Sequence, residues 1–205
     1  MMVESFERQV QTMALPAFNI HRTSRFKERD LNDVVRTLEG VLPRYMDGNV
    51  DTKVILSELD LRIMADVALV HQAMINLVKN AMDAMPNGGN FSIETSRANF
   101  QNGSIADGRN GKGSPCAFIS FVDTGYGIDE NIKGRIFEPS FTTKRGKAAG
   151  LGLPIAHHII KLHGGSMNVE SVAGRGTAIN VYLPLVRLES INRTAIALPD
   201  RFRGI

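Results

Sequence analysis

An aspartate and two closely spaced glycines follow an apolar run, and this part of the sequence is the best suited to ligand chemistry. Asp123, Gly125 and Gly127 come directly after residues 117–122, which read as a buried strand. Glycines at the end of a strand permit a tight turn and let the backbone approach a ligand. An ionised carboxylate only accepts hydrogen bonds, so Asp123 can select an exocyclic amine such as that of adenine. This spacing alone also fits an ordinary turn, so the other motifs decide its meaning.

A polar stripe runs along a predicted helix upstream of this turn. Residues 66–85 carry apolar side chains at helical spacing, with Asp66 as N-cap and a Pro-Asn-Gly-Gly sequence after the helix. Three- and four-residue steps place the polar side chains on one face: Gln72, Asn76, Asn80 and Asp83. Mg²⁺ takes one or two protein oxygens beside waters and phosphates, and Asn80 is well placed for that role. The alternative is a solvated face, although such faces are usually rich in Lys and Glu.

A glycine-rich loop opens the last predicted helix. Residues 146–153 contain three glycines and lead into a helix that reaches residue 162, with Pro154 suited to its first turn. Such a loop presents free N–H groups and the positive end of a helix dipole to anions. Between this loop and the Asp123 turn, residues 136–144 combine two aromatics, a proline and a lysine. This mixture suits a lid that closes over phosphates.

In this order, the four motifs resemble the ATP-binding catalytic domain of sensor histidine kinases, in the Bergerat-fold ATPase superfamily. The resemblance covers roughly residues 30–185. It implies an α+β fold, a two-layer sandwich in which three helices cover one face of a single mixed sheet. It also implies ATP and Mg²⁺ as ligands and protein-histidine phosphorylation in two-component signalling as the activity.

The resemblance gives each motif a role. Asn80 matches the Mg²⁺ ligand of the N box, and Asp123 the adenine-reading carboxylate of the first glycine box. Residues 137–144 match the F box of the ATP lid, and residues 150–153 the second glycine box. The implied catalytic residues are Asn76, Asn80 and Lys144. The implied nucleotide-binding residues are Asn80, Asp83, Asp123, Gly125, Gly127, Ile128, Phe137, Phe141, Thr142, Thr143, Lys144, Gly150, Leu151, Gly152 and Leu153.

Two departures from the family pattern bear on the chemistry. Ala148 and Ala149 stand where the second glycine box usually has a glycine and a small hydroxyl residue. Alanine restricts positive φ and has no hydroxyl, which argues against tight phosphate binding but not against nucleotide binding as such. Asn76 stands where hydrolytic members of the superfamily have a glutamate that activates water. Asparagine is no general base, so fast ATP hydrolysis is not expected.

None of the five histidines is followed by an acidic residue, the arrangement that marks the phosphoacceptor of the family. They are His21, His71, His157, His158 and His163. His163 ends a predicted helix, where a cationic or polar side chain suits the helix dipole. The acceptor histidine is therefore expected on a dimerisation domain or partner kinase outside this chain, with a response-regulator receiver domain downstream.

The expected domain extends over residues 30–186. Residues 1–29 carry apolar side chains at helical spacing, interrupted by Pro16, and weakly resemble the end of a dimerisation helix and its linker. A truncated kinase, a natural protein without phosphoacceptor helices and an arm without a role all fit this segment. Residues 187–205 are expected to be a linker or docking tail.

Composition excludes several classes of function. The 205 residues, 43% hydrophobic, can bury one sizeable core. A net charge of +3 without basic runs argues against nucleic-acid binding. Cys116 is the single cysteine, so no intrachain disulfide is possible. No apolar run approaches the ~20 residues of a membrane span, and no signal peptide is evident. A cytoplasmic location is expected, although a longer parent protein could be membrane-anchored.

Hydrophobic periodicity predicts the remaining elements. Residues 31–42 read as an amphipathic helix, and residues 52–58, 91–95, 167–171 and 178–183 as strands. Residues 99–115 are rich in Gly, Asn and Ser and predict a long exposed loop or hairpin tip.

Two hypotheses of different classes follow. The first is an enzyme, the ATP-binding part of a histidine kinase. The second is a non-catalytic regulator that docks on a partner kinase, favoured by Ala148, Ala149 and the missing acceptor histidine. The intact Asn80, Asp123 and F box favour the first. A serine-phosphorylating relative in the same superfamily is a third reading, and the F box argues against it.

Overall fold

The computed structural model describes residues 25–186 except 47–48, 102–103, 106–112 and 143–149. Its main sheet is mixed, with strand order β2-β4-β6-β8-β7 and a short β5 paired with β4. The pair β2 and β4 is parallel, whereas the other pairs are antiparallel. These strands are β2 (Val50–Ile55), β4 (Gly89–Gln101), β5 (Ser104–Ile105), β6 (Ser114–Asp123), β7 (Ser166–Val172) and β8 (Gly176–Pro184).

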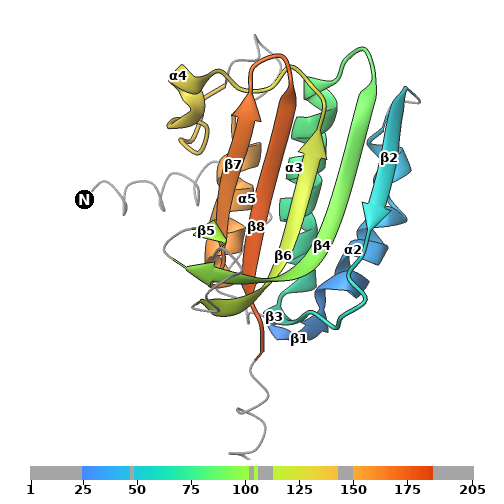
Figure 1. Ribbon diagram of the computed structural model, residues 1–205, viewed down its shortest axis with the longest axis vertical. Helices are drawn as coiled ribbons and strands as arrows, with labels where there is room; N and C mark the ends of the chain where they lie inside the picture. The colour runs from blue at the N-terminus through green and yellow to red at the C-terminus, as the bar shows by residue number, and fades with distance from the viewer. Residues whose placement is uncertain (1–24, 47–48, 102–103, 106–112, 143–149, 187–205) are drawn as a thin grey trace, which may run out of the picture.

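Three helices cover one face of this sheet (Figure 1), which confirms the predicted two-layer α+β fold. They are α2 (Leu31–Glu39), α3 (Val67–Ala84) and α5 (Gly152–Leu162). The core lies between the layers, because the apolar faces of the helices meet inward-pointing strand residues such as Phe91, Ile93 and Ile119. A shorter helix, α4 (Glu130–Lys133), follows β6. Among the described residues, no helix has the length and hydropathy needed to cross a membrane.

The helix α3 forms as its sequence predicts. The Asp66 carboxylate accepts hydrogen bonds from the backbone N–H groups of Ala68 and Leu69, at 3.1 and 3.4 Å, and so caps the first turn. The buried face consists of Val70, Ala73, Met74, Leu77, Val78, Ala81 and Ala84. The chain then turns at Gly88 and Gly89, both with positive φ, directly into β4.

Several predicted boundaries were wrong. The first helix ends at Glu39 rather than residue 42, because the chain continues as a short 3-10 turn whose second residue is Pro43. The strand predicted at residues 52–58 is β2, Val50–Ile55. The two ends of the segment predicted as a long loop or hairpin tip, residues 99–115, lie in strands, since β4 reaches Gln101 and β6 begins at Ser114. The antiparallel pairing of these two strands agrees with the hairpin option. Backbone pairing between the two strands outweighs the polar composition there.

A second, two-stranded sheet that the sequence did not predict closes one end of the domain. It pairs β1 (Lys27–Asp30) with β3 (Arg62–Ala65), and β3 leads into α3. Ile63 forms a bridge with Leu185, and the Val186 N–H donates to the Arg62 carbonyl at 2.8 Å. The first and last described segments therefore both lie against β3.

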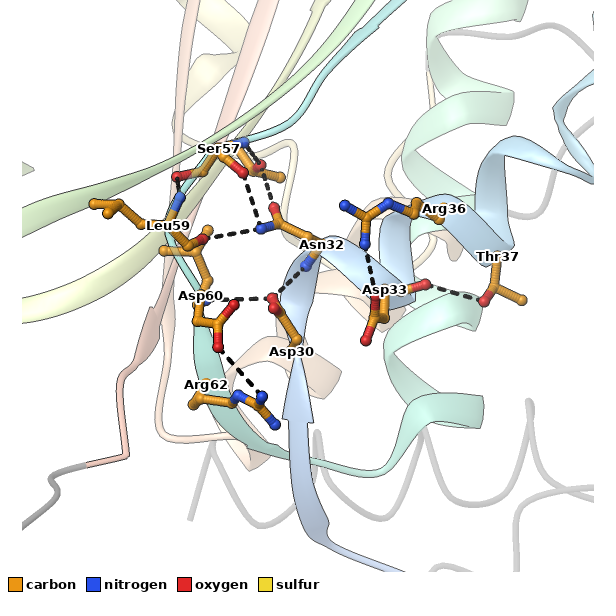
Figure 2. Close-up of polar contacts among 11 residues, drawn as sticks. Asp30, Asn32, Asp33, Arg36, Thr37, Ser57, Leu59, Asp60 and Arg62 are labelled. Carbon is orange, nitrogen blue, oxygen red and sulfur yellow. Dashed lines mark hydrogen bonds and ion pairs between the residues drawn. The ribbon is translucent and has the colours of Figure 1, made fainter.

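A buried polar network fixes the start of α2 (Figure 2). Asn32 is 3% exposed, and its amide nitrogen donates to the carbonyls of Ser57 and Leu59 at 3.2 and 3.0 Å. Its amide oxygen accepts from the Thr95 hydroxyl at 2.7 Å, which in turn accepts from the Ser57 N–H. Asp30 caps α2 at the Asn32 N–H and also accepts from the Leu61 N–H. Every polar atom of the Asn32 side chain thus has a partner, as burial requires.

His163 joins the ends of two helices at the same end of the domain. Its Nδ1–H donates to the Ile159 carbonyl at 2.7 Å, and its Nε2 accepts from the Asp66 N–H at 3.2 Å. Phe26 packs against the ring in a tilted arrangement, with centroids 4.6 Å apart. Burial lowers the pKa of His163, although its backbone hydrogen bonds and Asp66 oppose this. The sequence predicts a cationic or a polar side chain at this helix end. Because Nε2 accepts a hydrogen bond, His163 is the neutral polar side chain of these two options.

Replacing Asn32 by alanine should destabilise the fold by about 3 kcal/mol, because two carbonyls and a hydroxyl lose a buried partner. Urea unfolding followed by circular dichroism measures this. The matched control is Asn90→Ala at an exposed position, which should change stability by less than about 0.5 kcal/mol. Equal stability of the two variants would contradict a structural role for the network.

Stability should fall as the pH is lowered from about 7.5 to about 5.5, because the unfolded state binds protons that the neutral His163 does not. The loss begins near the unfolded histidine pKa of about 6.5 and ends below the lowered native pKa of His163. Urea midpoints at both pH values should show a smaller drop for His163→Gln than for the wild type. Part of the drop remains in the variant, since burial also lowers the pKa of His157. An unchanged drop would refute this account of His163.

Candidate functional site

A cavity of about 360 Å³ lies between α3, the start of α5 and the carboxyl end of β6. This volume is in the range of small-molecule sites. Twelve of the residues predicted from the sequence line it: Asn76, Asn80, Asp83, Asp123, Gly127, Ile128, Phe141, Thr142, Gly150, Leu151, Gly152 and Leu153. Gly125 and Phe137 are not among the lining residues. Thr143 and Lys144 lie outside the described residues, as do Ala148 and Ala149.

The carboxylate of Asp123 is the buried acid of this cavity. Asp123 is the last residue of β6 and is 7% exposed. Its Oδ1 accepts from the Gly125 N–H at 2.9 Å, and the Thr177 N–H on β8 also donates to the carboxylate. Burial raises the pKa of Asp123, and the two backbone donors oppose the rise. The result is an acceptor held in a fixed orientation with little water around it.

The glycines beside Asp123 are needed for backbone packing. A Cβ on Gly125 would lie 2.5 Å from the Ala84 carbonyl oxygen, and one on Gly127 would lie 2.2 Å from that of Val172. Gly127 also has a φ of +69°, whereas Gly125 does not need positive φ. The sequence interpretation was that these glycines let the backbone approach a ligand. The contacts show that they let the loop approach the protein's own backbone on two sides.

The amide stripe of α3 faces the cavity. The Asn76 Oδ1 accepts from Gln72 Nε2 at 3.2 Å, while the buried Asn76 Nδ2 has no hydrogen-bond partner among the described residues. The Asn80 amide lies against Gly152, whose added Cβ would be 3.7 Å from Asn80 Oδ1. Gly152 therefore leaves the Asn80 amide and the first turn of α5 side by side. The Asn76 Nδ2, a buried donor without a partner among the described residues, suits an oxygen-rich ligand.

The donor set also fits a cation held largely by its ligand. The described residues contain no group of three or more His, Cys, Asp or Glu that could hold a metal. Asn80 and Asp83 line the cavity, and one or two such oxygens are what Mg²⁺ takes when phosphates supply others. The residues present therefore fit Mg²⁺ bound together with a phosphate, and Asn80 would then be the protein ligand.

The start of α5 offers an anion site in the same cavity. Leu151 is the N-cap and makes no side-chain capping bond, so no side chain among the described residues caps the N–H groups of the first turn. Gly150 precedes it with a φ of +65° and packs against Phe141, whose carbonyl oxygen would be 2.6 Å from an added Cβ. A side chain is excluded there, and the loop brings the helix N-terminus to the cavity wall.

The described part of the segment predicted to form a lid, residues 136–142, is held by contacts of its aromatics. Phe137 stacks on His157 of α5, with ring centroids 4.7 Å apart. The Arg135 guanidinium lies over the Phe141 ring at 4.5 Å and pairs with Glu138 at 3.1 Å. Phe137 thus acts as a contact between lid and helix, which explains why it does not line the cavity. The sequence prediction of apolar anchors in this segment agrees with these contacts.

Nine lining residues were not predicted: Lys79, Ala81, Ala84, Tyr126, Ile132, Ile136, Pro154, Thr177 and Ile179. Ala81 and Ala84 lie on the helix of the amide stripe, and helical spacing could have identified them. Thr177 follows a turn in sequence, but β6 and β8 pair Thr177 with Asp123, and only the fold shows this. Ile132 lies in α4 and Ile136 shortly after it, and this helix was too short to predict.

Comparison with known proteins agrees with this geometry. Residues 65–187 match the family described as histidine kinase-, DNA gyrase B-, and HSP90-like ATPase. The chain is 34% identical over 171 residues to the sensor kinase CckA of Brucella abortus (strain 2308), covering 83% of this chain and 18% of that protein. It is 32% identical over 170 residues to sporulation kinase C of Bacillus subtilis (strain 168), covering 78% of this chain and 34% of that protein.

A solved structure shows the same fold. The catalytic domain of the histidine kinase ThkA superposes with a TM-score of 0.60 at 29% sequence identity, covering 78% of this chain and 96% of that chain. The chain spans 18% and 34% of the length of the two relatives named above. The similarity therefore concerns one domain of these longer kinases. The chain belongs to the histidine kinase-, DNA gyrase B- and HSP90-like ATPase family, as an ATPase domain of the sensor histidine kinase type.

Proposed function

We propose that this chain binds Mg²⁺-ATP in the cavity and presents the γ-phosphate for transfer to a histidine outside the chain. One observation carries the proposal: a buried carboxylate, an amide stripe and an open helix N-terminus line the same cavity. Asp123 suits an exocyclic amine, whereas Asn80 and the first turn of α5 suit phosphates and a cation. The loop after Asp123 is bonded to Ala84 at the carboxyl end of α3, and Asn76 lies about 12 Å away along the helix. The acceptor for the amine and the groups for the phosphates therefore lie apart.

Each of these groups has a part in phosphoryl transfer. A bound Mg²⁺ would neutralise phosphate charge, with Asn80 as its ligand. The N–H groups at the start of α5, together with Lys144 on the lid, would hold the terminal phosphate for in-line attack. Asn76 cannot take a proton from water, so the chain lacks at this position the base that hydrolysis needs. Such a site keeps the phosphate for a protein nucleophile.

The acceptor histidine is proposed to come from elsewhere. His71 donates from Nε2 to the Val34 carbonyl at 3.0 Å, His163 is buried, and His157 stacks on Phe137. These contacts support structural roles for the three side chains. A histidine-containing dimerisation domain or partner kinase would then supply the nucleophile, and a receiver domain would take the phosphate onward. A cytoplasmic site of action is part of the same proposal.

Calorimetric titration with a non-hydrolysable ATP analogue, with and without Mg²⁺, tests the proposal directly. Binding in the micromolar range that Mg²⁺ strengthens is the expected result. Absence of binding would overturn it and favour the regulator that docks on a partner kinase, with Ala148 and Ala149 as the cause.

Asp123→Asn should abolish detectable binding of the ATP analogue, because the amide presents a donor where the exocyclic amine needs an acceptor. The same titration measures the affinity. Asp51→Asn, an equivalent change at an exposed position on β2, should keep wild-type affinity. An Asp123→Asn protein that binds like the wild type would show that this carboxylate does not contact the base.

Asn80→Ala should remove the Mg²⁺ dependence of binding, since the protein oxygen that holds the cation is lost. The affinity with Mg²⁺ should fall to the level that the wild type shows without it. Asn87→Ala, in the exposed turn after α3, serves as control. If Mg²⁺ still strengthens binding to Asn80→Ala as it does for the wild type, the metal ligand lies elsewhere.

A further inference from the structure

The loop that follows Asp123 is held from both sides. On one side, the Tyr126 N–H donates to the Ala84 carbonyl at the end of α3, at 3.0 Å. On the other side, the Gly174 N–H in the β7–β8 turn donates to the Tyr126 carbonyl at 2.8 Å. Both bonds join backbone groups, so they do not depend on which side chains are present. The next N–H of the loop that bonds across is that of Ile128, and its partner is a side chain.

That partner is Ser171, near the end of β7. Its Oγ accepts from the Ile128 N–H at 2.8 Å and donates to the Gly176 carbonyl at 2.8 Å. Oγ also lies 3.0 Å from the Thr177 hydroxyl. A serine hydroxyl has one proton, which Gly176 takes, so Thr177 must donate in this third contact. Ser171 is 8% exposed, and its donor and acceptor capacity is filled by protein groups.

These contacts connect Ser171 to Asp123 by two routes. Through Ile128 it fixes the far end of the loop whose Gly125 N–H donates to the carboxylate. Through Gly176 and Thr177 it fixes the start of β8, whose Thr177 N–H also donates to the carboxylate. The Gly176 backbone lies close against that of Asp123, since an added Cβ would lie 2.0 Å from the Asp123 carbonyl oxygen. Ser171 itself is not among the residues that line the cavity.

We infer that Ser171 is a positioning residue for base selection: it holds the glycine loop and β8 in register, so that Asp123 reads adenine, without contacting the nucleotide. This inference rests on the proposed function. Removing the hydroxyl leaves the partly buried Ile128 N–H and the buried Gly176 carbonyl without this partner, and the loop and β8 lose their side-chain connection. The phosphate side of the site, at Asn80 and α5, has no contact with Ser171 among those described.

The test compares affinities of the full chain for non-hydrolysable analogues of ATP and GTP. Ser171→Ala should weaken binding of the ATP analogue about tenfold and change binding of the GTP analogue little. The preference for adenine, which is the ratio of the two affinities, should therefore narrow. Ser171→Cys, which nearly keeps the volume of serine with a weaker hydrogen-bonding group, should narrow it as well. Ser166→Ala on the same strand is the control, because its buried Oγ has no hydrogen-bond partner among the described residues.

The outcomes separate this inference from the proposed function. A narrowed preference in the Ala and Cys variants, with wild-type preference in Ser166→Ala, supports a positioning role. An unchanged preference, or equal weakening of both analogues, would overturn the role of Ser171 and leave the ATP site standing. A wild-type chain that binds neither analogue would overturn the proposed function and this inference with it.

Discussion

The buried carboxylate of Asp123 is the constraint on which the site depends. A carboxylate taken out of water is costly unless donors surround it. Two backbone N–H groups supply them, one from the following loop and one from the neighbouring strand β8. Both donors reach Asp123 only if the loop and β8 lie against backbone at Gly125 and Gly176. Because the Asp123 carboxylate needs these donors, it determines where the end of β6, the following loop and the start of β8 meet.

The helix α3 connects the loop after Asp123 with the rest of the domain. Its carboxyl end receives the loop through the Ala84 carbonyl, and its middle turns present Asn76 and Asn80 to α5. Its amino end is tied to α5 through His163 and to β1 through β3. One rigid element therefore sets the distance between the acid and the amides. Packing of its apolar face against the sheet, rather than helix propensity alone, keeps this distance fixed.

Most of the fold and of the cavity could be predicted from the sequence, because the informative residues are local. Helical spacing and a capping aspartate identified α3, and glycine spacing identified the loop after β6. Residues that act through tertiary pairing could not be found this way. Thr177 reaches the site through strand register, and Ser171 acts through backbone groups distant in sequence. The sheet of β1 and β3 was missed because each strand has only four residues, too few to show a period.

The pairing of β1 with β3, and of β3 with the residues that follow β8, also has a consequence for attachment. The described chain begins and ends at one pole of the sandwich (Figure 1), whereas Asp123 and its loop lie at the opposite pole. Any longer polypeptide that carries this domain holds it by a single pole. Rotation about that pole would move the whole domain as one body. The domain can therefore be inserted between neighbouring modules without rearranging its interior.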